Sequence, residues 1–211
     1  MSYKVKEVYY TIQGEGYHTG RPALFCRFAG CNLWTGLEND RNKAICTFCD
    51  TEFVGTDGPS GGVFDSADAL ANHVLDQWPN NAIPNPYVVC TGGEPLLQMD
   101  QNLVDAFHKN RIEIAIETNG TLLPPKNIDW ICVSPKIGSD LVLNSGNELK
   151  FVYPQGQENP EQFVDLEFNH FSLQPMAGSD LNNNIKKTLE YCRLHPHWNL
   201  SLQTHKFLGI P

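Results

Sequence analysis

Residues 87–95 read Tyr-Val-Val-Cys-Thr-Gly-Gly-Glu-Pro, and these nine residues give the strongest indication of the fold. Its apolar start, 87–90, predicts a short buried strand, and the glycine pair with the glutamate and proline predicts a turn at the carboxyl end of that strand. A helix with one apolar face is predicted over 99–110, and a strand with isoleucine at alternate positions is predicted over 112–117. A strand, a helix and a second strand in this order favour a parallel α/β unit.

The same alternation continues along the chain. Further strands are predicted at 23–29, 130–134, 148–153, 170–174 and 198–203, and further helices at 67–78 behind an N-cap at Ser66, after Pro160, and at 182–194. Polar or glycine-rich signatures follow four of these strands, at 92–94, 117–119, 134–136 and 174–175. Because the carboxyl ends of parallel strands line the site in such folds, the sequence predicts one cavity there.

Composition and charge exclude several classes of function. The chain has 211 residues, of which 41% are hydrophobic and 18% charged, and this balance predicts one ordinary globular domain over 1–211. Its formal net charge of −9 argues against a nucleic-acid partner, which needs a basic face. No signal peptide and no membrane-spanning apolar run is visible, so we expect a cytoplasmic protein without a membrane partner.

Three of the seven cysteines, Cys31, Cys46 and Cys49, form the pattern Cys-x14-Cys-x2-Cys within a predicted long loop at 30–62. Three thiolates can hold three irons of a 4Fe–4S cluster and leave the fourth iron open to a small molecule. A zinc site or three buried thiols are the alternatives. Zinc prefers a fourth protein ligand, and the sequence offers neither a second Cys-x2-Cys pair nor paired histidines.

These motifs resemble those of the radical S-adenosylmethionine (SAM) enzymes. The resemblance rests on the cysteine triplet, with Phe48 before its last member, and on the Gly-Gly-Glu-Pro stretch at 92–95. The usual spacing in that family is Cys-x3-Cys-x2-Cys, whereas fourteen residues separate the first two thiols here. The departure matters little for the chemistry, because the free energy of closing a loop grows only logarithmically with its length.

Further segments narrow the resemblance to the 7-carboxy-7-deazaguanine synthases, in which an extended first spacing also occurs. The similar segments lie between residue 7 and residue 211, at 12–16, 27–32, 49–51, 134–136, 173–176, 203–206 and the closing 209–211. The resemblance implies a single radical SAM domain over 1–211 that folds as an α/β, incomplete TIM-like (β/α)6-type barrel with shortened helical elements. It implies that helices are missing, notably between the strands near 117 and 130.

The resemblance also implies an activity. Family members carry out a SAM- and Mg²⁺-dependent radical ring contraction of 6-carboxy-5,6,7,8-tetrahydropterin to 7-carboxy-7-deazaguanine, with loss of ammonia, in queuosine (7-deazapurine) biosynthesis. An enzyme with this activity is a carbon–nitrogen lyase. The resemblance further implies one 4Fe–4S cluster with three cysteine ligands, SAM and Mg²⁺ as cofactors, and a small-molecule pterin as substrate. It also implies a homodimer and a flavodoxin- or ferredoxin-type reductant.

Site residues follow from the resemblance, position by position. The cluster ligands are Cys31, Cys46 and Cys49, and Thr51 is the Mg²⁺ ligand. The implied SAM-binding residues are Phe48, Cys49, Asp50, Gly93, Glu94, Glu117, Asn119, Ser134, Pro135, Lys136, Gln174, Pro175, Met176 and Ala177. The implied substrate-binding residues are Ile12, Gln13, Gly14, Glu15, Arg27, Thr91, His205 and Pro211, the last through its carboxylate.

Physical chemistry supports several of these roles and leaves ordinary alternatives open. Gly93 lets a ligand approach the backbone, but a glycine pair more often marks a plain turn. Arg27 can grip a carboxylate through paired N–H donors, but an exposed arginine on an edge strand is the commoner case. Lys136 can be a solvated surface lysine and Met176 plain core packing. Thr51 suits Mg²⁺ only if the substrate supplies further oxygens.

Two rival functions remain at this stage. The chain can be another small radical SAM enzyme, such as a glycyl-radical activase, or a non-catalytic, zinc-stabilised binding module. An iron–sulfur carrier would leave the stretch at 92–95 without a purpose. The sequence has no Ser-His-Asp arrangement that would indicate a hydrolase. It also lacks a Gly-Lys-Ser/Thr after the glycines of 55–62, which a phosphate-binding loop would have.

Overall fold

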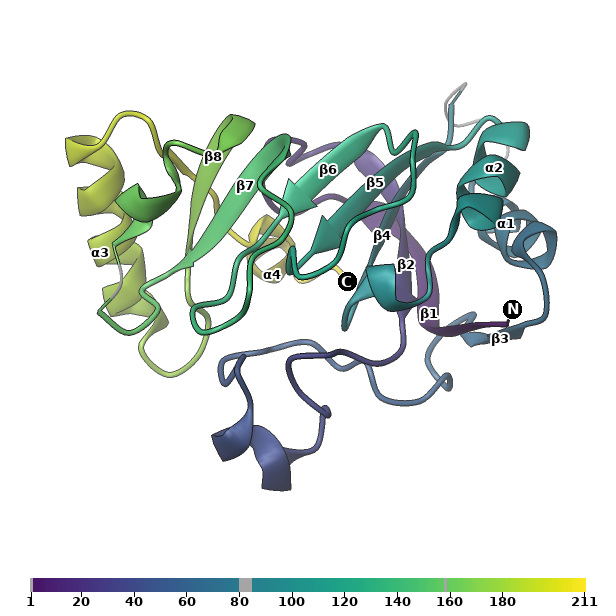
Figure 1. Ribbon diagram of the computed structural model, residues 1–211, viewed down its shortest axis with the longest axis horizontal. Helices are drawn as coiled ribbons and strands as arrows, with labels where there is room; N and C mark the ends of the chain where they lie inside the picture. The colour runs from purple at the N-terminus through teal and green to yellow at the C-terminus, as the bar shows by residue number, and fades with distance from the viewer. Residues whose placement is uncertain (1, 80–84, 158) are drawn as a thin grey trace.

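A computed structural model describes residues 2–79, 85–157 and 159–211 of the chain, and its strands form one mixed, nine-stranded sheet (Figure 1). The strand order is β3-β1-β2-β4-β5-β6-β7-β8-β9. The strands are β1 (Tyr3–Ile12), β2 (Pro22–Phe28), β3 (Gly62–Phe64), β4 (Tyr87–Gly92), β5 (Glu113–Thr118), β6 (Trp130–Val133), β7 (Ser145–Tyr153), β8 (Glu167–Pro175) and β9 (Asn199–Leu200).

The sheet confirms the α/β fold and the incomplete barrel. From β2 through β4 to β9 each strand runs parallel to its neighbour, whereas β1 pairs antiparallel with both β2 and β3. The sheet does not close, because β3 and β9 lie at opposite ends of the strand order. The antiparallel pair β1 and β3 was not predicted from the sequence.

The helices are short and few. They are α1 (Ala67–Asp76), α2 (Gln101–Lys109), α3 (Leu181–Leu194) and α4 (Thr204–Leu208), with 3₁₀ turns η1 (Glu38–Lys43), η2 (Pro95–Leu97) and η3 (Pro160–Phe163). The predicted N-cap of α1 is confirmed, because the Ser66 hydroxyl accepts a hydrogen bond from the Ala69 N–H at 3.1 Å. No helix joins β5 to β6 in the described chain, as predicted.

Two sequence predictions are wrong in extent. The strand predicted over 198–203 is only the two residues of β9, because Gln203 already lies at the N-terminus of α4. The helix predicted after Pro160 is the single 3₁₀ turn η3. The predicted loop at 30–62 is mostly irregular, although η1 interrupts it.

The two faces of the sheet differ in polarity, and this difference positions the site. Alternate residues of β7 point to opposite faces, so Leu149 and Phe151 join the apolar core while Glu148 and Lys150 point to the concave face. One core lies under α1 and α2, which pack side by side, and another lies under α3 (Figure 1). The concave face therefore carries buried polar groups. Within the described residues, no helix combines the length and apolar character that a membrane span requires.

Candidate active site

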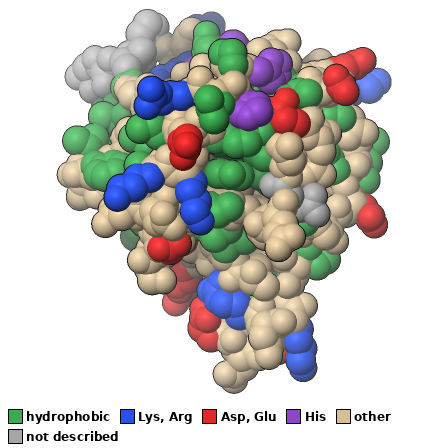
Figure 2. All heavy atoms as spheres, turned by 90° about the vertical axis from the view of Figure 1, so that its left-hand side faces the viewer, with side chains coloured by type: hydrophobic (Ala, Val, Ile, Leu, Met, Phe, Trp, Pro, Cys, Tyr) green, Lys and Arg blue, Asp and Glu red, His purple; other side chains and the backbone are tan. Residues whose placement is uncertain are grey.

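A cavity of about 410 Å³ opens on the concave face at the carboxyl ends of the parallel strands. This volume suits small-molecule ligands. Every implied site residue except Glu94, Pro135 and Met176 lines it, so the structure brings together residues from both ends of the chain. The cysteine loop (residues 30–61) projects from the body of the molecule (Figure 1), and in Figure 2 the narrow lower end carries acidic and basic side chains next to one another.

The three thiols of the triplet face this cavity together. Cys31 follows β2, and its sulfur accepts a hydrogen bond from the Leu33 N–H at 3.4 Å. The hydrogen bond that Cys46 shares with Cys49 lowers the pKa of Cys49 to about 6 and, together with burial, raises the pKa of Cys46. Burial raises the pKa of Cys31. One thiolate therefore forms readily, and binding a metal must drive off the other two protons.

Three thiols form a donor set of the kind that can hold a 4Fe–4S cluster. Among the described residues, no group of three His, Cys, Asp or Glu side chains is arranged to hold one metal ion. In a 4Fe–4S cluster each thiolate binds a different iron, so the three sulfurs need only surround a shared space. Cys31, Cys46 and Cys49 line the same cavity and lie close enough to affect one another's pKa, so they fit that requirement.

Gly93 is required where β4 meets the cysteine loop. A Cβ atom there would lie 2.0 Å from the Gly30 carbonyl oxygen and 2.9 Å from the Cys31 Cβ. The Glu94 N–H donates to the same Gly30 oxygen at 2.9 Å. The glycine therefore lets the end of β4 pack against the base of the cysteine loop, which is a different close approach from the ligand contact that the sequence suggested.

Glu94 lies behind the cavity wall and does not line the cavity. Its buried carboxylate accepts hydrogen bonds from the Leu96 N–H at 3.0 Å, the Thr118 hydroxyl at 2.7 Å and the Asn119 N–H at 2.8 Å. It thereby ties the turn after β4 to the end of β5. Direct contact between this carboxylate and a ligand in the cavity would require some of these bonds to break.

Among the described residues, Lys136 presents its ammonium to the cavity without a direct ion pair, although Cys46, Cys49 and Glu94 lie near enough to favour its charged form. Its ammonium donates to the Ser134 carbonyl oxygen at 2.6 Å and to the Ser134 hydroxyl at 2.7 Å, and it forms no ion pair within the described residues. Burial lowers the pKa of Lys136. An anionic ligand group beside it would favour the charged ammonium further.

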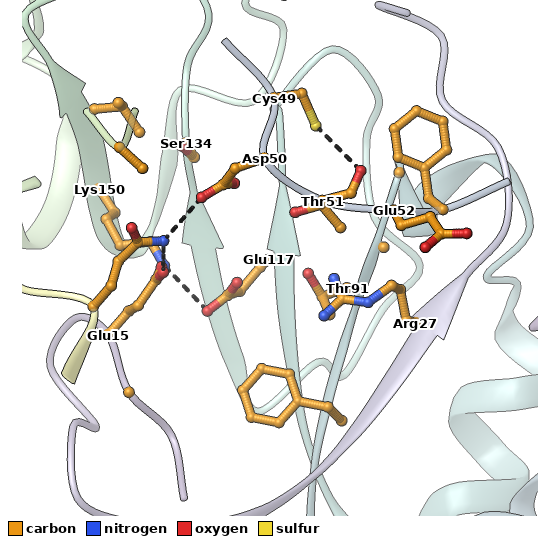
Figure 3. A pocket seen from close by; sticks show the side chains of 18 of the residues that line it. Glu15, Arg27, Cys49, Asp50, Thr51, Glu52, Thr91, Glu117, Ser134 and Lys150 are labelled. Carbon is orange, nitrogen blue, oxygen red and sulfur yellow. Dashed lines mark hydrogen bonds and ion pairs between the residues drawn. The ribbon is translucent and has the colours of Figure 1, made fainter. Parts of the chain in front are cut away.

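Arg27 is not an exposed arginine on an edge strand, since β2 lies between β1 and β4 and the side chain is only 16% exposed. Its Nε donates to the Glu7 carboxylate at 2.7 Å and one Nη to the Tyr9 hydroxyl at 3.0 Å. Figure 3 shows Arg27 beside Thr91, with Glu15 and Lys150 on the other side of the pocket. The fixed guanidinium keeps further N–H donors for a ligand.

The C-terminal segment, residues 201–211, returns to the pocket beside the loop that follows β1. The Thr204 N–H donates to the Gly14 carbonyl oxygen at 2.9 Å, and the Thr11 hydroxyl donates to a Pro211 oxygen at 2.9 Å. A Cβ atom on Gly14 would lie 2.2 Å from the His205 Nδ1, so glycine is needed for this contact. The Lys206 ammonium also pairs with Asp50 at 2.6 Å.

Several cavity residues were missed by the sequence reasoning. The most informative is Lys150, whose ammonium donates to Glu15 at 2.6 Å and to Glu117 at 3.2 Å (Figure 3). A lysine between Leu149 and Phe151 in the strand predicted at 148–153 was the signal that could have revealed it. The other missed residues are Lys6, Glu7, Tyr9, Phe25, Leu33, Trp34, Glu52, Phe53, Thr118, Val152, Gln203 and Lys206.

Comparisons with known proteins agree with this geometry. The chain is 58% identical over 210 residues to the 7-carboxy-7-deazaguanine synthase of Bradyrhizobium diazoefficiens and 55% identical over 211 residues to that of Burkholderia multivorans, and each alignment covers 100% of both chains. The chain belongs to the 7-carboxy-7-deazaguanine synthase family. Like the other members, it is an enzyme.

More distant members of the 7-carboxy-7-deazaguanine synthase family agree. The synthase of Escherichia coli strain K12 is 31% identical over 238 residues, again with 100% of both chains covered. The fold matches the crystal structure of QueE from Escherichia coli with a TM-score of 0.70 and 26% identity, covering 96% of this chain and 94% of that one. No family model matches the chain.

Proposed function

We propose that the chain catalyses the SAM- and Mg²⁺-dependent radical ring contraction of 6-carboxy-5,6,7,8-tetrahydropterin to 7-carboxy-7-deazaguanine, with loss of ammonia, in queuosine (7-deazapurine) biosynthesis. It would be a carbon–nitrogen lyase of the radical SAM class. One observation carries this proposal: the three thiols of the triplet line one cavity together with Arg27 and with Lys136, which lies near Cys46 and Cys49. The family membership of the chain supports the same reaction.

Each group of residues has a separate task in this proposal. Cys31, Cys46 and Cys49 would hold a 4Fe–4S cluster, which with SAM supplies the radical chemistry when bound. The ammonium of Lys136 would hold the carboxylate of SAM, and Ser134 its ribose. The remaining SAM contacts would come from Phe48, Asp50, Gly93, Glu117, Asn119, Gln174, Pro175 and Ala177, which line the cavity.

The substrate would lie against the opposite wall. Arg27 and the Pro211 carboxylate would fix its charged and polar groups, while Gln13 and Glu15 would pair with its heterocyclic edge. Ile12, Gly14, Thr91 and His205 complete this wall, and Thr51 would bind Mg²⁺ together with oxygens of the substrate. Glu94, Pro135 and Met176 would act through their neighbours, because they do not line the cavity.

The proposal extends to organisation and partners. We expect residues 1–211 to act as one radical SAM domain, to form a homodimer and to receive electrons from a flavodoxin- or ferredoxin-type protein. A reducing, cytoplasmic setting suits this chemistry, because iron binds cysteine as the free thiolate.

Anaerobic reconstitution with iron and sulfide, followed by SAM, Mg²⁺, a reductant and the pterin, tests the proposal. We expect about four irons and four sulfides per chain, and conversion of the pterin to 7-carboxy-7-deazaguanine. SAM should be needed only in catalytic amounts. Cleavage of SAM without consumption of the pterin would instead indicate another radical SAM enzyme, and a colourless protein with one zinc would indicate a binding module.

Arg27→Lys tests the substrate wall. Lysine keeps the charge but loses the planar pair of donors, so we expect the Kd for the pterin to rise roughly ten-fold. The Kd for SAM should stay the same, as anaerobic calorimetry can show. Arg193→Lys, on the exposed face of α3, is the matched control. An equal weakening of pterin and SAM binding would mean that Arg27 acts on the fold through Glu7 and Tyr9.

A further inference from the structure

Lys150 is a buried cation in the pocket for which the proposed reaction has so far no role. Its side chain is 5% exposed, and it points from the concave face of β7 between the carboxylates of Glu15 and Glu117. The two carboxylates belong to different elements, the loop after β1 and the end of β5. A buried ion pair is rarely a net source of stability, so this arrangement calls for another reason.

The backbone around Glu15 is held without Lys150. The Thr204 N–H donates to the Gly14 carbonyl oxygen at 2.9 Å, and the Gly16 N–H donates to the Ser201 hydroxyl at 2.9 Å. These bonds flank Glu15 on both sides and join its loop to the C-terminal segment. The ammonium of Lys150 therefore acts on the Glu15 carboxylate rather than on the path of the chain.

The same holds for Glu117. Its backbone belongs to the parallel ladder between β5 and β6, opposite Cys132. Besides the bond from Lys150, its carboxylate accepts a hydrogen bond from the Gln13 amide at 3.2 Å. Removal of the ammonium would leave β5 in register and would change only the charge and the placement of the carboxylate.

The ammonium of Lys150 keeps the carboxyl group of Glu15 ionised. Burial alone would raise the pKa of Glu15, but the charge and hydrogen bond of Lys150, with the hydrogen bond from Gln203 at 2.8 Å, lower it to about 2. Glu15 is therefore ionised throughout the neutral range. An ionised carboxylate can only accept hydrogen bonds, so this part of the pocket complements a ligand edge made of N–H donors.

We propose that Lys150 is a positioning residue that sets the specificity of the site: it holds the carboxylates of Glu15 and Glu117 in place as hydrogen-bond acceptors that select an edge of N–H donors on the substrate. This inference rests on the proposed function, since a pterin carries such an edge in its ring N–H and exocyclic amino group. Figure 3 shows Glu15 and Lys150 at the left of the pocket and Glu117 next to them, toward its centre. Lys150 itself need not touch the substrate.

The Lys150→Met variant tests this role in the reconstituted enzyme with SAM and Mg²⁺. Loss of a partner of a buried charge pair should raise the Kd for the pterin about 30-fold. The informative comparison is with an analogue whose exocyclic amino group is replaced by a carbonyl oxygen, because that oxygen is an acceptor. The wild-type preference for the pterin over this analogue should fall at least about ten-fold in the variant, while the Kd for SAM stays the same.

A pH profile separates this role from a structural one. Without the ammonium, burial would raise the pKa of Glu15, and a protonated carboxyl presents a donor to the donor edge of the substrate. The ratio of the variant Kd to the wild-type Kd should therefore rise as the pH falls from about 8 to about 6. The other titratable groups that face this trio are Tyr9 of β1, Tyr87 of β4, Cys132 of β6, Lys136 after β6 and Glu148 of β7. They are present in both proteins, so the comparison tests the carboxylate pair.

Two further variants keep the test decisive if Lys150→Met folds poorly. Glu15→Gln with Lys150→Met removes one charge of each sign, so it preserves the local net charge. We expect this double variant to bind the pterin no more weakly than Lys150→Met alone and to show a flat Kd ratio over the same pH range. Lys150→Arg retains the cation and should recover most of the preference for the pterin. Lys109→Met, an exposed lysine on α2, is the matched control.

The outcomes are distinguishable. If wild-type enzyme neither binds nor converts the pterin, the proposed function fails. If wild-type enzyme converts the pterin but the variant keeps the same preference over the analogue and a pH-independent Kd ratio, the role of Lys150 is overturned. An equal loss of affinity for the pterin, the analogue and SAM would also overturn it, because a general collapse of the pocket produces that pattern.

Discussion

Replacing Cys46 by alanine is expected to abolish both the iron–sulfur cluster and the formation of 7-carboxy-7-deazaguanine. Cys46 is buried at the end of the cavity, shares a hydrogen bond with Cys49 and faces the same space as Cys31. With two thiolates left, two irons of a 4Fe–4S cluster would lack a protein ligand. Iron and sulfide analysis after anaerobic reconstitution should give values near zero, and product formation should fall to background.

The matched control is Cys192→Ala. Cys192 is another free thiol, half-buried on α3, and it does not line the cavity. We expect this variant to keep the wild-type iron content and activity. A Cys46→Ala protein that still carried four irons and turned over the pterin would show that Cys46 is not a ligand.

The sequence predicted the parallel part of the fold well, because that part is built from strong local patterns. The apolar strand and the turn after it at 87–95, and the alternation at 112–117, became β4 and β5 within a residue or two. The strand β1 was missed, because its inward and outward residues at 3–12 do not alternate cleanly between apolar and polar types. β9 and α4 were misjudged because a strand of two residues and a helix of five residues are too short for either period to show.

Most residues of the candidate site were predicted from the resemblance, but the side chains that hold those residues in place were not predicted. Motif residues such as Cys31, Lys136 and Arg27 could be named because the family pattern marks them. Lys150 and Lys206 were missed, because their partners Glu15 and Asp50 lie more than 130 residues away in the chain. Such pairs form only in the tertiary structure, and a single sequence does not show which distant residues come into contact.

Glu94 supports the wall of the cavity from behind, which the motif alone did not indicate. The Gly-Gly-Glu-Pro stretch implied a ligand contact for it, yet its carboxylate lies behind the wall and accepts bonds from three donors. The burial of this carboxylate raises its pKa in spite of those bonds. Its position indicates that it holds Thr118 and Asn119 in place, so that the Asn119 amide can donate to Asn32 in the cysteine loop at 2.9 Å.

We therefore expect Glu94→Ala to cause a large loss of stability, about 3 kcal/mol or more, because it leaves buried donors unpaired and a cavity behind the wall. This is a sizeable part of the 5–15 kcal/mol by which domains are usually stable. Urea unfolding followed by tryptophan fluorescence measures it. Glu190→Ala, on the exposed face of α3, should change the free energy of unfolding by less than about 0.5 kcal/mol.

The same variant separates a structural role of Glu94 from a ligand-binding one. If the carboxylate only organises the wall, SAM affinity and stability should fall together in Glu94→Ala, and Glu94→Gln should show a smaller loss of both. Glutamine restores one acceptor oxygen, but its amide nitrogen would face the N–H of Asn119 or the donors of Thr118 and Leu96. A Glu94→Gln protein with wild-type stability and a weakened affinity for SAM would contradict this account, because only a direct contact with the ligand would then explain the loss.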